Sequence, residues 1–237
     1  MIYLGTSGWS YDHWVDNFYP KKIDKRDWLN FYSKKFNTVE VNASFYRLPF
    51  KNMVKGWKNK TPDEFHLTFK GSNLITHKKK LKDVEEYLDK FNSRFKMLGN
   101  KKGAILWQLP PSLSRNDDLL EKFLSNLNSK FDQAIEFRHK SWFTKKIYGL
   151  LEKYEIGFCI ISSPDFKTDL KVTTDFAYFR WHGKNNWYRY NYSEDELKKW
   201  AKKIKKLDLE NVYGYFNNDF KGYAPKNCLQ LKEIIEQ

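Results

Sequence analysis

The chain has 237 residues, of which 41% are hydrophobic and 18% aromatic, a composition that excludes a disordered chain and fits one globular domain over residues 1–237. Its formal net charge of +14 favours anionic partners, either a small anionic molecule or nucleic acid. The sequence has no apolar run long enough to cross a bilayer, so we expect a cytoplasmic protein without a membrane partner.

Strands and helices alternate along the chain. Short apolar runs predict eight strands, at residues 2–6, 38–42, 65–70, 103–108, 133–137, 156–161, 176–181 and 212–216. Apolar residues at helical spacing predict helices at residues 24–36, 52–59, 81–95, 116–127, 141–154 and 193–206, and from 225 onward. The segment 162–175 contains Pro164 and lacks helical periodicity, so we expect the helix after the sixth strand to be missing or rudimentary.

Three of these helices have a predicted first residue. Asn116 is expected to cap one helix, and Ser141 is expected to begin the next. Ser193 and Glu196 have the spacing of a capping box before the helix that runs to Lys206. The alternation of strands and helices predicts an α/β fold, a closed (β/α)₈ TIM barrel in a single domain, with an open doubly wound sheet as the alternative.

Charged and amide side chains recur where the predicted strands end. Such groups cost free energy inside a buried strand unless they are paired with another group or take part in a functional site. Glu136 and Arg138 have the same strand parity, so both face the same side. In a TIM barrel the reactive site lies at the carboxyl ends of the strands. One polar site is therefore predicted there, built from Glu40, Asn42, Lys70, Gln108, Glu136, Arg138, Arg180, His182 and Asn217.

An ordered set of motifs runs through nearly the whole chain. The motifs are GTSGWSY (5–11), FYP (18–20), TVEVNASFYR (38–47), ILWQLPP (105–111), EFRHKSW (136–142), YFRWHG (178–183) and YFNN (215–218). With these motifs the chain resembles the YecE-like family, a domain of unknown function. The resemblance implies a TIM-barrel fold and assigns no reaction.

Three residues are candidates for proton transfer. Glu136 and Glu40 supply two carboxylates facing one cavity, which can act as acid, base or nucleophile. The alternative is structural ion pairing, of Glu136 with Arg180 and of Glu40 with Lys70. His182 can transfer protons near neutral pH or can order the loop that follows it. A two-carboxylate glycosidase is disfavoured, because the surrounding cations lower the pKa values of both carboxyl groups.

Other residues are candidates for substrate binding. Lys70, Arg138 and Arg180 would neutralise an anion. The amides of Asn42, Gln108, Asn217 and Asn218 would orient the substrate. Ser7 lies in a turn of small residues whose backbone amides would form an anion nest, with a plain tight turn as the alternative. The loop aromatics Trp9, Tyr11, Trp187, Tyr188 and Tyr190 would stack on a ring or anchor their loops.

Metal and cofactor sites are not expected. The cysteines Cys159 and Cys228 are far apart in the sequence and fit no metal or redox spacing, and Cys159 is expected to fill the core. Glu40, Glu136 and His182 are the one plausible set of metal ligands, and the nearby cations oppose a divalent ion.

The leading hypothesis is an enzyme acting on an anionic, phosphate-bearing substrate. Phosphodiester hydrolysis is one version, and chemistry on a small phosphorylated metabolite or sugar acid is another. The alternative is a non-catalytic, basic nucleic-acid-binding module, supported by the net charge and the aromatic loops. A barrel that binds a small anion as a sensor or scaffold is the third reading. The oligomeric state is left open.

Overall fold

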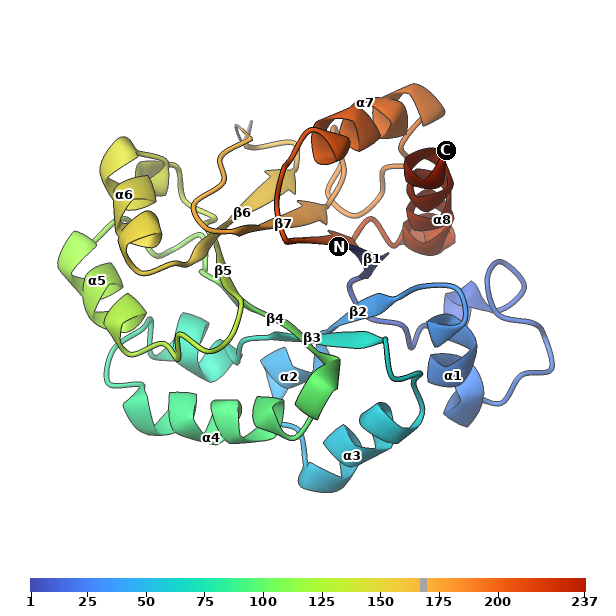
Figure 1. Cartoon of the computed structure of the whole chain (residues 1–237), viewed down its shortest axis with the longest axis horizontal. Helices are drawn as coiled ribbons and strands as arrows, with labels where there is room; N and C mark the ends of the chain where they lie inside the picture. The colour runs from blue at the N-terminus through green and yellow to red at the C-terminus, as the bar shows by residue number, and fades with distance from the viewer. Residues whose placement is uncertain (167–169) are drawn as a thin grey trace.

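The computed structural model describes residues 1–166 and 170–237, and its strands form a barrel surrounded by helices (Figure 1). All eight predicted strands are present, and they pair in parallel in the order β1-β8-β7-β6-β5-β4-β3-β2. The predicted single-domain TIM barrel is confirmed. The strands are β1 (Ile2–Thr6), β2 (Thr38–Val41), β3 (His66–Lys70), β4 (Lys102–Gln108), β5 (Gln133–Glu136), β6 (Gly157–Ser162), β7 (Phe176–Trp181) and β8 (Asn211–Phe216).

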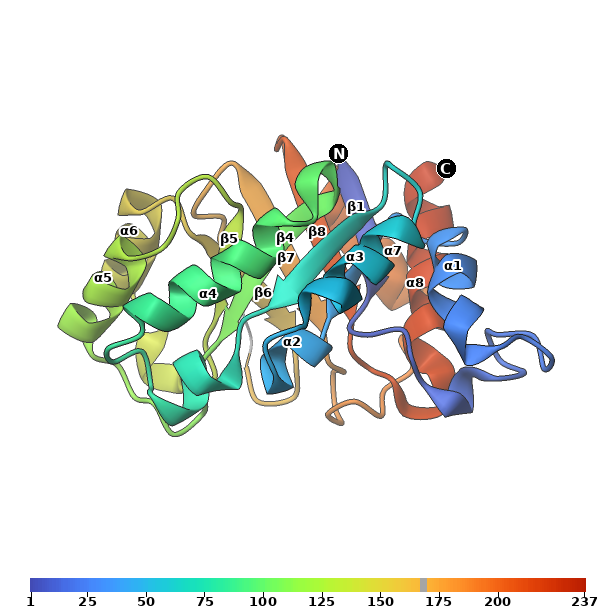
Figure 2. The ribbon, with the colours of Figure 1, turned by 90° about the horizontal axis from the view of Figure 1, so that it is seen from below.

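The helices form an outer layer around these strands (Figure 1). One helix that the sequence patterns did not predict, α2 (Ala43–Tyr46), follows β2 directly and lies at the edge where the strands end (Figure 2). Both chain termini lie at the opposite edge (Figure 2). The remaining α-helices are α1 (Trp28–Ser33), α3 (Lys51–Asn59), α4 (Glu85–Lys96), α5 (Asp117–Ser125), α6 (Lys145–Lys153), α7 (Glu194–Lys205) and α8 (Tyr223–Glu236).

Local side-chain chemistry sets several helix starts. Asn116 caps α5 by accepting from the backbone N–H of Leu119 at 2.9 Å, and the capping box of Ser193 and Glu196 begins α7, as predicted. The start predicted at Ser141 is wrong. Ser141 belongs to a short 3₁₀ helix, and α6 begins after Thr144, whose hydroxyl accepts from the N–H of Ile147.

Two other predicted helices are shorter than their apolar patterns. The pattern at 24–36 contains α1, which ends at Ser33, and the pattern at 81–95 contains α4, which begins only at Glu85. Leu81 and Asp83 have positive φ angles of 70° and 49°, a conformation that a right-handed helix excludes. After β6, the described residues 163–166 and 170–175 contain no helix, in agreement with the prediction, and residues 167–169 lie outside the described part of the chain.

Side chains complete the barrel at the seam between β1 and β2. These strands share a single backbone bridge in the described structure, between Ser7 and Glu40. Elsewhere along the seam the amide of Asn37 bonds the backbone of Leu4 and Ile2, at 3.0 and 2.8 Å. The close approach of the strands requires glycine at position 5, because a Cβ atom there would lie 2.2 Å from a backbone oxygen. The bridge at Ser7 and Glu40 therefore closes the barrel at its carboxyl end.

Apolar side chains fill both sides of the strands. Between strands and helices, Trp107 packs against Phe91 and Phe123, because its strand parity is opposite to that of Gln108 and directs its side chain outward. The barrel interior holds a smaller cluster that includes buried Cys159, as expected, and several tyrosines. Within it the Tyr215 hydroxyl contacts the hydroxyls of Thr38 and Thr68, at 2.9 and 2.6 Å. The hydroxyls of Tyr215, Thr38 and Thr68 thus form a layer of hydrogen-bonded groups inside the barrel.

Candidate active site at the carboxyl ends of the strands

A buried arginine connects three strands at the carboxyl end of the barrel. Arg180 on β7 donates from Nη1 to Oε2 of Glu136 at 2.6 Å and from Nη2 to Oε1 of Glu40 at 2.7 Å. All three side chains are fully buried. The pairing of Glu136 with Arg180, which is the structural alternative to catalysis, is present, whereas Glu40 forms its ion pair with Arg180 and not with Lys70. Arg180 is therefore held by two carboxylates of the protein itself.

The carboxylate of Glu40 has further partners on neighbouring strands. Its Oε2 accepts from the Tyr178 hydroxyl at 2.7 Å, and its Oε1 accepts from the hydroxyl of Ser7. The Ser7 hydroxyl also accepts from Arg180 Nη2 at 3.0 Å and lies 3.2 Å from Oδ1 of Asn42. Ser7 and Asn42 thus extend the buried network toward the barrel edge. Glu40 itself is held in one orientation by three neighbours.

Glu136 is surrounded by cationic and polar groups. Arg138 donates to its Oε1, and Nε2 of His182 lies 3.5 Å from its Oε2. Burial acts to raise the pKa of Glu136, but the charges of Arg138 and Arg180 overcome it and hold that pKa well below its ordinary value. Glu136 is therefore an ionised carboxylate at neutral pH. In this state it orients Arg138 and Arg180 and has no proton to donate.

His182 is buried beside this carboxylate. Its Nε2 lies 3.1 Å from Nη2 of Arg138, and its Nδ1 lies 3.1 Å from Nδ2 of Asn217. Burial lowers the pKa of His182 to about 3, so the imidazole is neutral near pH 7. These contacts favour the second of the two roles considered for this residue, in which a neutral imidazole orders its surroundings.

Two cations remain on the open side of the network. Arg138 is partly exposed, and its guanidinium lies 4.5 Å from the centre of the Trp187 ring. Lys70 ends β3 and is half-buried, with its ammonium 4.2 Å from the centre of the Phe45 ring. Within the described residues no carboxylate lies at ion-pair distance from Lys70. Burial and the nearby charge of Arg180 lower the pKa of Lys70 to about 8.

The charges of this cluster do not balance. Arg138, Arg180 and Lys70 stand against the two carboxylates of Glu40 and Glu136. One positive charge is left without an internal counter-ion among these residues. An anionic ligand at the barrel mouth would supply the missing negative charge.

The other predicted binding residues divide into two groups. Gln108 pairs in register with Glu136 at the end of β4 and is partly exposed, so its amide is available at the barrel mouth. Asn218, in contrast, is fully buried. Its amide donates to the backbone of Tyr190 at 2.7 Å and to the side chain of Asn227 at 2.8 Å. That geometry commits Asn218 to holding the loop between β7 and α7.

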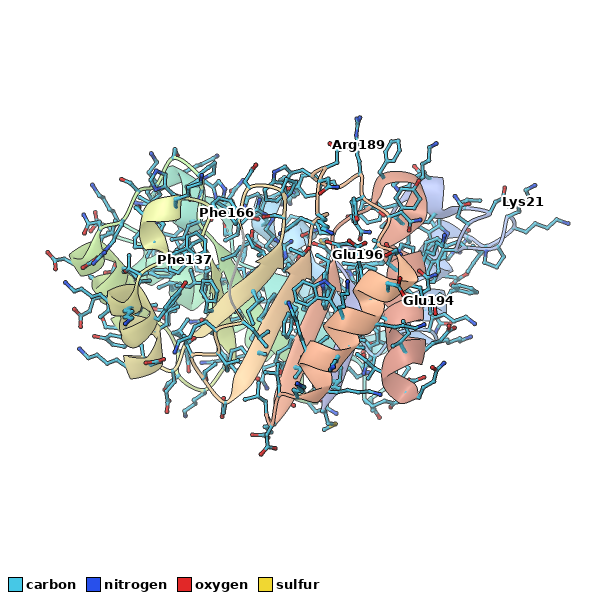
Figure 3. The ribbon with its side chains drawn as sticks, turned by 90° about the horizontal axis from the view of Figure 1, so that it is seen from above. Lys21, Phe137, Phe166, Arg189, Glu194 and Glu196 are labelled. Carbon is cyan, nitrogen blue, oxygen red and sulfur yellow. The ribbon has the colours of Figure 1, made fainter. Side chains whose placement is uncertain are left out.

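The aromatic residues of the same loop are also engaged. The Trp187 indole donates to Asp165 at 2.8 Å while its ring covers Arg138, and the Tyr190 hydroxyl donates to Glu196 at 2.9 Å. Tyr188 donates its backbone N–H to the carbonyl of His182 at 2.6 Å. Figure 3 shows this loop, marked by Arg189, beyond the start of α7, which is marked by Glu194 and Glu196. The loop is anchored to the site by its aromatic residues.

Two histidines near the site have no supporting pattern in the sequence. His77 contacts the Phe45 ring, with 5.1 Å between ring centres, and its pKa is lowered by burial and by the charges of Lys70 and Arg138. His13 pairs with Asp219 at 2.9 Å, across 206 positions of sequence. The one available signal for His77 is its place in the polar loop after β3. No local pattern could have paired His13 with Asp219.

Comparison with known proteins agrees with this architecture. The family model described as "Protein of unknown function DUF72" matches residues 3–237. This chain belongs to the DUF72 family. The UPF0759 protein YunF of Bacillus subtilis is 28% identical over 276 aligned residues, which cover all of this chain and 95% of YunF. The UPF0759 protein YecE of Escherichia coli K12 is 32% identical over 146 residues, which cover 61% of this chain and 51% of YecE.

A solved structure supports the same assignment. The crystal structure of a DUF72 family protein from Thermotoga maritima MSB8 matches over the whole of both chains, with 31% sequence identity and a TM-score of 0.91. The resemblance to the YecE-like family is thereby confirmed. Within the described residues of this DUF72 protein, no helix is long and apolar enough to span a membrane. The same residues contain no group of three histidine, cysteine or carboxylate side chains arranged to hold a metal ion.

Proposed function

We propose that this DUF72 protein is an enzyme that acts on a phosphate-bearing substrate at the carboxyl ends of the barrel strands. The observation that carries the proposal is Lys70, a half-buried ammonium at a strand end without a carboxylate partner in the described structure. Buried charges in proteins are ordinarily paired, so an unpaired cation at the mouth of a TIM barrel is suited to an anionic substrate.

The residues divide into two roles. Lys70 and Arg138 contact the phosphate and stabilise the negative charge that develops in the transition state. Glu136 and His182 contact Arg138 and position it, and Arg180 and Glu40 continue the same buried network of hydrogen bonds and ion pairs. Gln108, Asn42 and Asn217 supply amides at the rim. In this assignment Glu136 and His182 act through Arg138, Glu40 acts through Arg180, and none of the three acts on the substrate directly.

Lys70 also suits proton transfer. An acid works best when its pKa lies near the working pH, and the pKa of about 8 places Lys70 there. In phosphodiester hydrolysis, the version we propose, the oxygen of a water molecule bonds to phosphorus and one ester P–O bond breaks. The departing oxygen takes a proton from the Lys70 ammonium. The proton that the attacking water loses then restores that ammonium.

Titration calorimetry with inorganic phosphate and with phosphate esters tests the proposal. We expect Lys70→Met to abolish binding and Lys21→Met to leave it unchanged. Lys21 is a suitable control because its side chain is 76% exposed and it lies on a loop that projects from the outer margin of the molecule, away from the strands (Figure 3). Equal binding by the two variants would refute the proposal.

A non-catalytic nucleic-acid-binding module remains the second candidate, supported by the net charge of +14. Such a module would bind oligonucleotides through dispersed surface lysines, and its affinity would fall steeply with salt. Binding that survives Lys70→Met but disappears at high salt would favour this candidate over the enzyme.

A further inference from the structure

An aromatic cavity lies beside the charged cluster at the carboxyl end of the barrel. It has a volume of about 440 Å³ and is lined chiefly by Trp9, Tyr11, Asn42, Tyr46, Met53 and Trp57. These residues come from the loop after β1, from the segment after β2 and from α3. The volume lies in the range of small-molecule sites, about 300–1,000 Å³.

The cavity and the charged cluster share a wall. Asn42 lines the cavity, and its Oδ1 lies 3.2 Å from the Ser7 hydroxyl of the buried network. Tyr11 also lines the cavity, and its hydroxyl donates to the backbone oxygen of Ser7 at 2.7 Å. Gly8 permits this arrangement, because a Cβ atom there would lie 2.5 Å from the Tyr11 hydroxyl. Tyr11 and Asn42 are therefore held at the boundary between the two sites.

The helix α2 places the Lys70 ammonium next to the cavity. The Phe45 ring of this helix lies over the ammonium, and Tyr46, the next residue, lines the cavity. The centres of the Phe45 and Tyr46 rings are 5.1 Å apart. These two ring contacts connect the cation to the cavity wall. A ligand with its phosphate at Lys70 would thus reach the cavity with a group attached to that phosphate.

The cavity exposes apolar side chains that a ligand would cover. Tyr46 is 74% exposed and Met53 is 40% exposed, although most large apolar side chains of this protein are buried. Trp9 and Trp57 meet edge to face, with 5.9 Å between ring centres. Aromatic walls of this kind favour a planar ring, which gains stacking contacts on either face. The asparagine amide at the boundary adds a polar group that could orient the ligand.

We propose that this cavity binds a planar ring of the substrate, so that the substrate is a nucleotide, with its phosphate at Lys70 and Arg138 and its base in the cavity. This inference rests on the proposed function, because it places the base relative to the phosphate site. A free nucleotide and a nucleotide within a single strand offer the same chemistry, and the test below distinguishes them.

The test measures the affinities of adenosine 5′-monophosphate, ribose 5-phosphate and a short single-stranded oligonucleotide by titration calorimetry. We expect the mononucleotide to bind more tightly than ribose 5-phosphate. Tyr46→Ala should weaken mononucleotide binding about tenfold, because the base loses one stacking partner, and should leave ribose 5-phosphate binding unaffected. The exposed position of Tyr46 makes this variant safe for the fold.

Phe50→Ala is the matched control, because Phe50 is also an exposed aromatic residue, at 52%, and does not line the cavity. If Tyr46→Ala and Phe50→Ala behave alike while Lys70→Met abolishes phosphate binding, the base site is refuted and the phosphate site stands. If none of the three compounds binds, both proposals fail. Tyr46-dependent binding of the oligonucleotide alone would assign the cavity to a strand instead of a free nucleotide.

Discussion

Removing the buried guanidinium of Arg180 should destabilise this protein severely. In Arg180→Met, Glu136 keeps its second cation, Arg138, but Glu40 keeps only the neutral donors Tyr178 and Ser7. The cost is therefore that of one uncompensated buried carboxylate, about 3–5 kcal/mol. Because a domain has about 5–15 kcal/mol of total stability, this loss is a large fraction of it. Urea denaturation followed by circular dichroism measures the change.

A second substitution tests which carboxylate is left unpaired. Adding Glu40→Gln to Arg180→Met should recover most of the lost free energy, because a neutral amide at position 40 no longer needs a cation. Adding Glu136→Gln should recover less, since Glu136 still has Arg138. Arg189→Met, in the exposed loop of Figure 3, is the control and should change stability by less than about 0.5 kcal/mol. A loss below about 1 kcal/mol for Arg180→Met, or better rescue by Glu136→Gln, would refute this reasoning.

Three further predictions follow from single residues. Because the pKa of His182 is about 3 when folded and about 6.5 when unfolded, the folded state binds fewer protons. Stability should therefore fall as pH drops below 6.5, by at most about 1.4 kcal/mol per pH unit, and His182→Asn should remove this contribution. Phosphate binding should weaken above pH 8 as Lys70 loses its proton, and Lys70→Arg should extend binding to higher pH. Gly5→Ala should separate β1 from β2 and cost about 1–3 kcal/mol or more.

One measurement tests each of these three predictions. Urea denaturation between pH 5 and 7 tests His182, and equal slopes in the wild type and His182→Asn would contradict the burial of a neutral imidazole. Calorimetric titrations with phosphate from pH 7 to 9.5 test Lys70, and identical pH profiles for Lys70→Arg and the wild type would exclude it as the titrating group. Gly149→Ala is the control for Gly5→Ala, because the added methyl group at position 149 meets no described atom within 4 Å. Equal free energies of unfolding for the two variants would disprove the close approach of β1 and β2 at Gly5.

The sequence by itself determined the barrel and the end of the barrel at which polar groups gather. Apolar residues recur every two positions in a strand and every 3.6 positions in a helix. This periodicity is a local property, so it predicts strands and helices without knowledge of the segments they pack against. Strand parity likewise placed Glu136 and Arg138 on one face and directed Trp107 outward. The pair of Glu136 and Arg180, considered as the alternative to catalysis, also follows from chemistry and topology, because both side chains lie inside one closed sheet near the ends of their strands.

Only the tertiary structure decided which charged side chains are paired within the protein and which one lacks a counter-ion. Glu40 lies within reach of more than one cation in a closed barrel, and the packing selected Arg180 as its partner, which left Lys70 without one. The neutral state of His182 depends on its burial, a property that no local pattern encodes. The aromatic cavity is built by Trp9, Tyr46 and Trp57 from separate segments. Desolvation and pairing depend on distances between segments far apart in the chain, and folding alone sets those distances.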